Sequence, residues 1–149
     1  MDEGVYRWVL ARLAFQFDPI VATRILPSPE NFIVELSKRR VPRYVFRNGK
    51  HYLTLKPSDG LFTISLDVGK IVVDASEYPR YRVVVRSLSG GSVFAHDVVD
   101  MDPDLRPGDE VVVVNEDGEV IGTGRLKIPL VMLKGLTRGE IVRVRHRRG

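Results

Sequence analysis

Arginines at alternating positions are the residues of this chain best suited to chemistry, and they lie in the stretch IVRVRHRR at residues 141–148. Successive side chains of a strand point to opposite faces, so burial of Val142 and Val144 is expected to place Arg143 and Arg145 outward together. Outward guanidinium groups make charge-assisted, often bidentate contacts with phosphates. A solvated strand end has the same pattern, so both interpretations stay open at this level.

A second cationic stretch, residues 38–56, has seven lysines or arginines and no acidic residue. Within it, Asn48-Gly49 separates two strand-like runs, which predicts a hairpin with a two-residue primed turn. One face of this hairpin is predicted to be a secondary basic face for phosphates and a stacked base, with Arg43, Val45, Arg47, Lys50, Tyr52 and Thr54. The other face is predicted to be core, with Tyr44, Phe46, His51, Leu53 and Leu55. A solvated basic face is the alternative to binding.

Patterns for catalysis or metal binding are weak. The three histidines are scattered and there is no cysteine, so neither a zinc site nor a nucleophile–base pair is indicated. His96-Asp97, with aspartates at 100, 102 and 104, imitates a metal or acid–base cluster, but its spacing fits no calcium loop and an acidic turn explains it. No phosphate loop or dinucleotide motif occurs. We therefore expect no enzyme activity, no cofactor and no metal.

Composition and charge are those of a folded, basic protein. The chain has 149 residues, 44% hydrophobic and 28% charged, with a net charge of +4. This length allows one ordinary domain or two small ones. The positive excess fits a polyanionic partner, although many basic proteins bind none. No apolar run approaches the ~20 residues of a membrane span, so we expect a cytoplasmic protein without a membrane partner.

Residues 102–114 are the stretch around which the second half of the chain is expected to form. A turn cluster of prolines, aspartates and a glycine runs into Val111–Val114. Proline and glycine stop a helix, and an unbroken valine run favours a strand covered on both faces, as in a small barrel. Asp117-Gly118 then predicts a hairpin turn into a strand at residues 120–126.

Caps and periodicity predict the remaining elements. Residues 2–16 are predicted to form a helix capped by Asp2, with Trp8 on its apolar face and not free to stack a base. The other expected elements are a strand at 20–26, a helix at 29–40 whose residues 32–34 also suit a strand, strands at 61–66, 71–73 and 82–86, a short helix at 130–134 and a closing strand at 141–146.

Several segments together resemble a PUA domain over residues 79–148. They are RPGDEVVVVNEDGEVIGTGRL at 106–126, a glycine loop with a short helix at 90–96, and RGEIVRVRH at 138–146. DGLFTISLDVGKIVV at 59–73 resembles the small domain that precedes PUA in archaeosine tRNA-guanine transglycosylases and, more loosely, a two-domain ribosome-biogenesis PUA protein. The resemblance implies an α+β fold, with a small N-terminal α/β-mixed domain at 1–77 and a PUA pseudo-barrel of mostly antiparallel strands at 78–149.

The resemblance also implies where RNA would bind. RNA-bound PUA domains make contacts mainly through the glycine loop and the closing strand, which here carry Gly90, Gly91, Ser92, Phe94, Arg143, Arg145, His146 and Arg147. Glycine lets a backbone approach a phosphate or base closely. Phe94 is weighed as a core residue in preference to a stacking one, and His96-Asp97 departs from the small or hydrophobic residues common in the family.

The function implied is non-catalytic binding of structured RNA, either tRNA or rRNA, as an accessory in RNA modification or ribosome biogenesis. The partner would be an RNA-modifying enzyme or a ribosome-assembly factor. One alternative is the RNA-binding subunit of a split transglycosylase, which requires an apolar surface patch on the N-terminal half for the catalytic partner. The other is a protein–protein adaptor without RNA binding.

Overall fold

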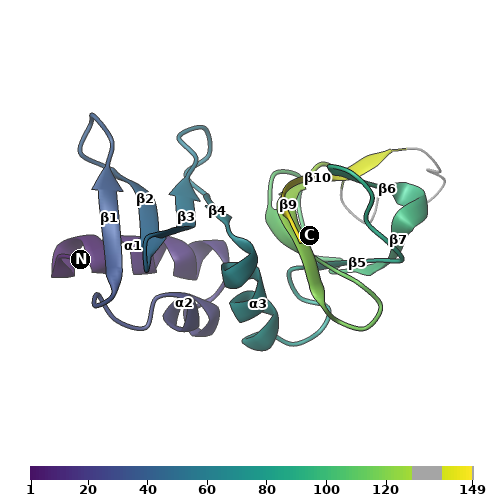
Figure 1. Cartoon of the computed structure of the whole chain (residues 1–149), viewed down its shortest axis with the longest axis horizontal. Coiled ribbons are helices and arrows are strands. Elements are labelled where there is room, and N and C mark those ends of the chain that lie inside the picture. Colours follow the sequence, from purple (N-terminus) through teal and green to yellow (C-terminus); the bar gives the residue numbers. More distant parts are fainter. Residues whose placement is uncertain (129–138, 149) are drawn as a thin grey trace.

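The computed structural model describes residues 1–128 and 139–148, and its strands form two sheets with a helix between them (Figure 1). The first half contains α1 (Glu3–Gln16), α2 (Pro19–Ile25), β1 (Phe32–Leu36), β2 (Pro42–Arg47), β3 (Lys50–Leu55), β4 (Phe62–Ile64) and α3 (Leu66–Asp74). Its antiparallel sheet has the order β1-β2-β3-β4. α1 packs against one face of this sheet, which leaves the other face open (Figure 1).

The second half is a pseudo-barrel. It contains β5 (Arg82–Val85), β6 (Ser92–Phe94), the 3-10 turn η1 (Ala95–Asp97), β7 (Val98–Met101), β8 (Glu110–Val114), β9 (Val120–Leu126) and β10 (Glu140–Arg147). The sheet order is β6-β10-β9-β8-β5-β7, and the pairing of β5 with β8 is parallel whereas the others are antiparallel. The predicted α+β class with a mostly antiparallel barrel is confirmed. We keep the predicted division at residues 77 and 78 as a proposal, which the change of sheet between β4 and β5 supports.

β8 lies at the centre of the molecule, as its valine run predicts. All five of its residues are buried. Val112 and Val114 belong to the hydrophobic cluster shared with the first half, whereas Val111 and Val113 belong to the cluster inside the barrel. Four of the five residues are valines, because apolar side chains suit a strand whose faces do not meet water, and the fifth is Glu110. The valine run therefore joins the two cores.

The helix predicted at residues 2–16 is confirmed, and Asp2 caps it by accepting a hydrogen bond from Gly4 N at 2.6 Å. The strand predicted at 20–26 was wrong, because these residues belong mostly to α2. Asp18 caps α2 by accepting from Val21 N at 2.8 Å, and Pro19 holds the first helical position. The same Asp-Pro pair that ends one helix therefore begins the next.

Two further predictions in the first half were wrong. The helix expected at 29–40 is replaced by β1, the alternative that residues 32–34 also allowed. The strand expected at 71–73 lies in α3, which Ser65 caps through Val68 N. Gly69 packs this helix closely onto β9, since an added Cβ would lie 2.9 Å from Thr123 Cγ2. The helix predicted at 130–134 lies outside the described residues.

A buried arginine ties the end of α3 to the barrel. Arg82 is 5% exposed, and its guanidinium donates to the carbonyl oxygens of Val73, Ser76, Glu77 and Arg80 at 2.7–3.3 Å. The last carbonyls of a helix have no hydrogen-bond partner within the helix. A guanidinium placed at this end therefore caps the helix, and the same hydrogen bonds satisfy its own donors. The two halves are thus connected by polar contacts as well as by the shared core.

Candidate nucleic-acid interface

The glycine bend, Gly90–Ser92, lies directly beside the closing strand. Val144 N donates to Gly91 O at 2.9 Å, Ser92 pairs with Arg143 across the sheet, and Arg147 Nη1 donates to Gly90 O at 3.1 Å. Gly90 has φ +84°, a conformation that favours glycine, and an added Cβ at Gly90 or Gly91 would meet no atom within 4 Å. The bend is therefore open to solvent, with two arginines at its edge.

Two cations that were missing from the predicted site share a hollow with Arg147, which contacts this bend. Arg86, at the end of β5, and Arg148, after β10, line a hollow of about 260 Å³ together with Arg147. Arg86 donates to the carbonyl oxygen of His96 at 2.8 Å, and Arg148 pairs with Glu119 at 3.2 Å. The sequence separates Arg86 from Arg147 by sixty residues, so only the closed barrel brings them together. We call Arg86, the glycine bend, Arg143, Arg147 and Arg148 the cationic cradle.

Arg143 is exposed but already has an anionic partner. Its Nε and Nη2 donate to the carboxylate of Glu140 at 3.1 and 3.0 Å, and Ser92 Oγ donates to the same carboxylate. The hydrogen bonds from Arg143 and Ser92 lower the pKa of Glu140, so the carboxylate is charged at neutral pH. An incoming phosphate meets a pre-oriented guanidinium, but it must share Arg143 with Glu140 or displace it.

Arg145 and His146 do not lie in the cradle. A β-bulge interrupts the pairing of β10 between Val144 and His146, and Arg145 Nη1 donates to the buried carboxylate of Glu110. Arg143 and Arg145 are both exposed, as predicted, but the guanidinium of Arg145 pairs with Glu110, so the two arginines do not form one surface. Burial, with the charges of Arg145 and His51, lowers the pKa of His146, which lines a small pocket between the two sheets. The predicted RNA contacts of Arg145 and His146 stay a proposal, and they would lie on a second surface outside the cradle.

Phe94 is more exposed than expected. It is 41% exposed, and its ring is parallel to that of His96 with 6.0 Å between centroids. It belongs to neither hydrophobic cluster. The preference for Phe94 as a core residue was therefore wrong, and its ring is available for stacking at the end of β6.

The predicted hairpin is confirmed, and Leu53 and Leu55 are buried as predicted, but several other residues were assigned to the wrong face. Asn48 and Gly49 both have positive φ, as a primed turn requires. A β-bulge beside Phe46 shifts the register, so that Val45 and Tyr52 are buried and the Tyr52 hydroxyl donates to Ile25 O at 2.6 Å. The rings expected in the core, Tyr44, Phe46 and His51, instead form a cluster with centroids 4.7–6.4 Å apart.

The residues predicted to form a secondary basic face therefore do not lie on one surface. Arg47 and Lys50 lie near the hairpin turn, where the Arg47 guanidinium is 5.9 Å from the centroid of the buried Tyr52 ring. Arg43 lies at the opposite end of the strands and lines a different pocket. Tyr52 is 3% exposed and cannot stack a base.

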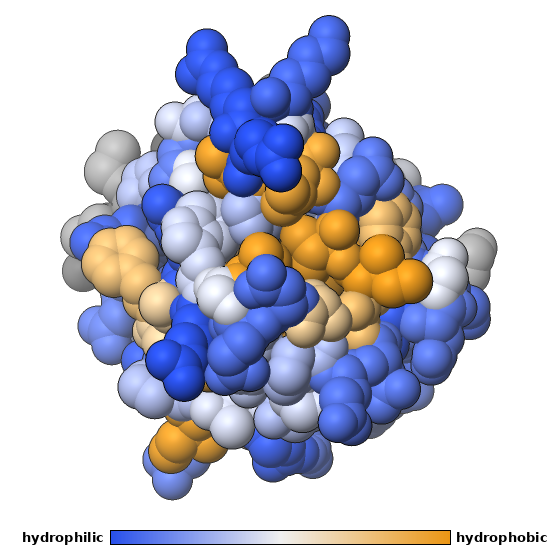
Figure 2. All heavy atoms as spheres, turned by 90° about the vertical axis from the view of Figure 1, so that its left-hand side faces the viewer, coloured by the Kyte–Doolittle hydropathy of each residue, from blue (hydrophilic) through white to orange (hydrophobic). Residues whose placement is uncertain are grey.

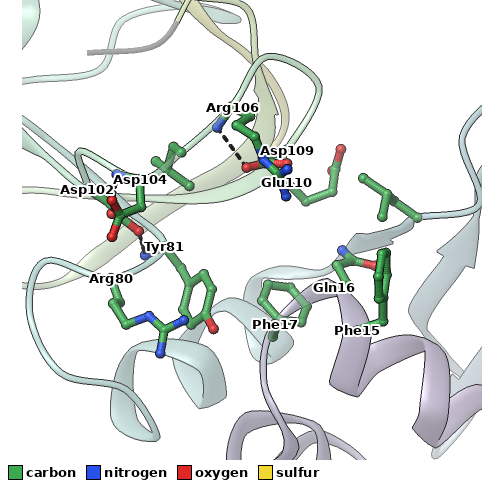
Figure 3. Close-up of a pocket in the computed structure, with 12 residues that line it drawn as sticks. Phe15, Gln16, Phe17, Arg80, Tyr81, Asp102, Asp104, Arg106, Asp109 and Glu110 are labelled. Atoms are coloured by element: carbon green, nitrogen blue, oxygen red, sulfur yellow. Dashed lines mark hydrogen bonds between the residues drawn. The ribbon is translucent and has the colours of Figure 1, made fainter. Parts of the chain in front are cut away.

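A pocket of about 190 Å³ between the two halves has the wrong charge for a polyanion (Figure 3). Four acidic residues line it against two arginines, Arg80 and Arg106. Two of these acids accept hydrogen bonds from backbone N–H groups. Asp102 accepts from Tyr81 N at 2.9 Å, and Asp109 accepts from Arg106 N at 2.8 Å. Over residues 1–128 and 139–148, no group of acids and histidines is arranged to hold a metal ion.

The described helices include none that is both long and apolar enough to span a bilayer.

A mostly antiparallel pseudo-barrel, with an open glycine bend beside a cationic closing strand, defines the PUA class of small barrels. The family model of the PUA domain matches residues 69–148, more than half of the chain, so the chain belongs to the PUA-domain family. Residues 9–79 match the patch-forming domain C2 of tRNA-guanine transglycosylase. The predicted resemblance to the portion of these enzymes that contains the pre-PUA and PUA domains is confirmed.

Two relatives of this chain are tRNA-guanine(15) transglycosylases. The tRNA-guanine(15) transglycosylase of Pyrococcus abyssi is 37% identical over 129 residues, which are 83% of this chain and 21% of that enzyme. The enzyme of the same name from Thermococcus onnurineus is 34% identical over 95% of this chain and 25% of its own length. The chain therefore spans a fifth to a quarter of the length of these two enzymes.

Solved structures show the same fold over the whole chain. A hypothetical protein from Pyrococcus horikoshii superposes with a TM-score of 0.74 at 22% identity, covering 99% of this chain and 92% of its own. A conserved PUA domain protein from Thermoplasma acidophilum superposes with a TM-score of 0.68 at 19% identity, covering 100% of this chain and 92% of its own. The two-part architecture therefore also occurs in chains of about this length.

Proposed function

We propose that this chain binds structured RNA, tRNA in the first place, through the cationic cradle, and that it serves tRNA modification as a non-catalytic component. The observation that carries the proposal is the open glycine bend, hydrogen-bonded to a closing strand whose arginines lie at its edge. A guanidinium beside an accessible backbone suits a phosphate and the adjoining sugar or base. The names of the relatives support tRNA over rRNA, and ribosome assembly remains the alternative context.

Binding to a tRNA transcript across a series of salt concentrations tests this proposal. Arg147→Gln and Arg86→Gln remove cradle cations, and each is expected to weaken binding about tenfold and to reduce the salt slope by about 1. Arg7→Gln is the matched control, because Arg7 is an exposed arginine on α1 with its own carboxylate partner, Glu3, and lies outside the cradle. Replacing the tRNA with an rRNA fragment decides between the two contexts.

An adaptor that does not bind RNA gives a different result. The wild-type protein would form no salt-sensitive complex with either RNA. Equal affinities for the wild type, Arg147→Gln and Arg86→Gln would also contradict the proposed cradle, even if the protein binds RNA elsewhere.

An apolar patch favours a second candidate function, the RNA-binding subunit of a split transglycosylase. β1 is an edge strand, and Ile33, Leu36 and Val41 on it and its following loop are 69%, 41% and 37% exposed. Figure 2 shows apolar surface gathered on this side of the first half, with hydrophilic side chains projecting above it. Exposed apolar edges mark interaction sites. We propose the catalytic portion of a transglycosylase as the occupant, since the relatives carry it in the same chain.

Charge placed in this patch is expected to prevent that association. Ile33→Lys should weaken binding to the separately expressed catalytic portion of the Pyrococcus abyssi enzyme at least tenfold, because a buried ammonium at the interface has no partner. Ile20→Lys on α2, where Ile20 is 70% exposed, is the control. Calorimetric titration measures both affinities, and equal losses in the two variants, or no binding by the wild type, would contradict this role.

A further inference from the structure

A second cationic pocket lies at one end of the first sheet, away from the cradle. It is formed between α1 and the two loops at residues 37–41 and 56–61, which lie at the same end of the strands in Figure 1. We call it the loop pocket, and its volume is about 290 Å³. Trp8 and Arg12 come from α1, Arg39 and Arg43 from the first loop and β2, and Lys56 from the second loop. No acidic residue lines it.

The charge in this pocket is not balanced by the protein. Lys56 is neutralised, since it donates to Glu110 at 2.8 Å and pairs with Asp59 at 3.0 Å. Arg12, Arg39 and Arg43 form no ion pair with any carboxylate in the described part of the chain. Three unpaired guanidinium groups around one hollow repel each other, so an anion bound there would gain electrostatic energy.

One of these arginines, Arg43, is half-buried and has one buried donor atom. Arg43 Nε is the buried side-chain nitrogen of the described residues that has no hydrogen-bond partner. Leaving such a donor unsatisfied costs roughly 1–3 kcal/mol, more for a charged group, so native structures seldom keep one without a ligand or a solvent partner. Arg43 also lines the loop pocket, so a ligand oxygen bound there is a candidate partner for this donor.

The neighbouring side chains hold Arg12 in place for the same ligand. The Arg12 guanidinium lies 4.5 Å from the centroid of the Trp8 ring, a cation–π contact that fixes its plane. Gly60 has φ +74°, and an added Cβ there would lie 3.0 Å from Arg12 Nη1, so glycine leaves room for the cation. Because Arg12 covers the exposed face of Trp8, the ligand is recognised by its oxyanion and not by a stacked base.

We propose that the loop pocket is a phosphate-binding site. Planar guanidinium groups match the oxygen geometry of phosphate better than any other cationic side chain. The phosphate comes either from the backbone of a bound RNA, in which case this inference rests on the proposed function, or from a free phosphate compound such as a nucleotide. Both sources present the same group to Arg12, Arg39 and Arg43.

Titration with pyrophosphate, followed by amide NMR of the full chain, tests the site itself. Pyrophosphate is expected to shift the amides of Gly60 and Arg43 in the wild type, and Arg12→Gln should weaken this binding about tenfold. Arg7→Gln removes the same charge from the same helix and should change the affinity less than twofold. Arg39→Gln on the exposed loop is the second variant should Arg12→Gln not fold. Shifts that are absent, or equal in Arg12→Gln and the wild type, overturn the proposal.

Titration with tRNA then identifies the source of the phosphate. If Arg12→Gln weakens tRNA binding about tenfold while Arg7→Gln does not, the RNA backbone supplies the phosphate. If pyrophosphate binds but tRNA affinity is unchanged in Arg12→Gln, the site takes a free phosphate compound. A wild-type protein that binds pyrophosphate and no tRNA would refute the proposed function and leave the phosphate site standing. If Arg147→Gln loses tRNA binding and the wild-type protein does not bind pyrophosphate, the proposed function is supported and the phosphate site is refuted.

Discussion

The double variant Lys56→Met/Arg145→Met is expected to lower the free energy of unfolding at pH 7 by about 3–5 kcal/mol. Glu110 is 3% exposed, and its carboxylate accepts from Lys56 on one side and Arg145 on the other. Removing both cations leaves a buried carboxylate without a counter-charge, which is far more costly than the loss of an exposed ion pair. The three residues join the two halves, so the loss should appear in the unfolding of the whole chain.

This loss is expected to depend on pH in a defined direction. Burial already raises the pKa of Glu110, and Lys56 and Arg145 oppose that rise. Without these cations the folded-state pKa moves further above the unfolded value of about 4.3. A group with a raised folded-state pKa contributes stability that is fully present below the unfolded pKa and is lost as the pH rises through the folded pKa. The deficit of the double variant should therefore shrink as the pH falls toward 4.

Urea unfolding between pH 4 and 8 measures both effects. Adding Glu110→Gln to the double variant should recover much of the loss at pH 7 and remove its pH dependence, because the buried charge is gone. Arg148→Met, which breaks the exposed pair with Glu119, is the control and should cost at most about 1 kcal/mol. A double variant with the same deficit at pH 4 and pH 7 would show that Glu110 is not the source of the instability.

The parts of the fold that were predictable are those whose signals are local and strong. The valine run Val111–Val114 of β8 has one explanation, since consecutive apolar residues suit a strand that is buried on both faces. Asn48-Gly49 fixes a primed turn through its own backbone preference. The order of the glycine bend and the closing strand follows from family resemblance, and the structure places them side by side. In these cases the residues themselves decide the conformation.

The errors concern short elements and long-range partners. Residues 19–25 and 66–74 are apolar runs that suit a strand as well as a helix, and the caps at Asp18 and Ser65 decide between them. A β-bulge has no reliable local signal, yet the one beside Phe46 placed Tyr52 in the core and left Tyr44, Phe46 and His51 outside the buried cluster. Arg145 was misplaced because its partner, Glu110, lies 35 residues away in the sequence.

The composition of the candidate site was predictable only in part for the same reason. Gly90, Gly91 and Arg147 follow from the bend and the strand that carry them. Arg86 belongs to a strand at the far side of the sheet order, and only closure of the barrel brings it beside Arg147. From the sequence alone, a charged residue at a strand end is interpreted as solvent-exposed, and the pattern does not show which residues it faces in the folded protein.

Closure of the barrel is tested most directly at Gly124, where Gly124→Ala is expected to cost about 3 kcal/mol or more. A Cβ built on Gly124 would overlap Arg143 O and would lie 2.8 Å from Val144 Cα, both backbone atoms of β10. No rotamer relieves such a contact, so β9 and β10 must separate or shift. Alanine in a strand is otherwise favoured over glycine by roughly 0.5–1 kcal/mol, so a large loss can only come from this contact.

Gly122→Ala is the matched control on the same strand. Its added Cβ would lie 3.2–3.3 Å from His146 O and from the side chains of Leu88 and Val144, contacts that small shifts relieve, and we expect a loss of about 1 kcal/mol. Thermal and urea unfolding give the stabilities, and tRNA binding by the folded fraction gives the functional consequence. Because Arg143 and Arg147 lie on β10, Gly124→Ala should weaken tRNA binding as strongly as the loss of both arginines, while Gly122→Ala retains it. Equal stabilities for the two variants would mean that β9 and β10 are not packed as closely as the Gly124 contact requires.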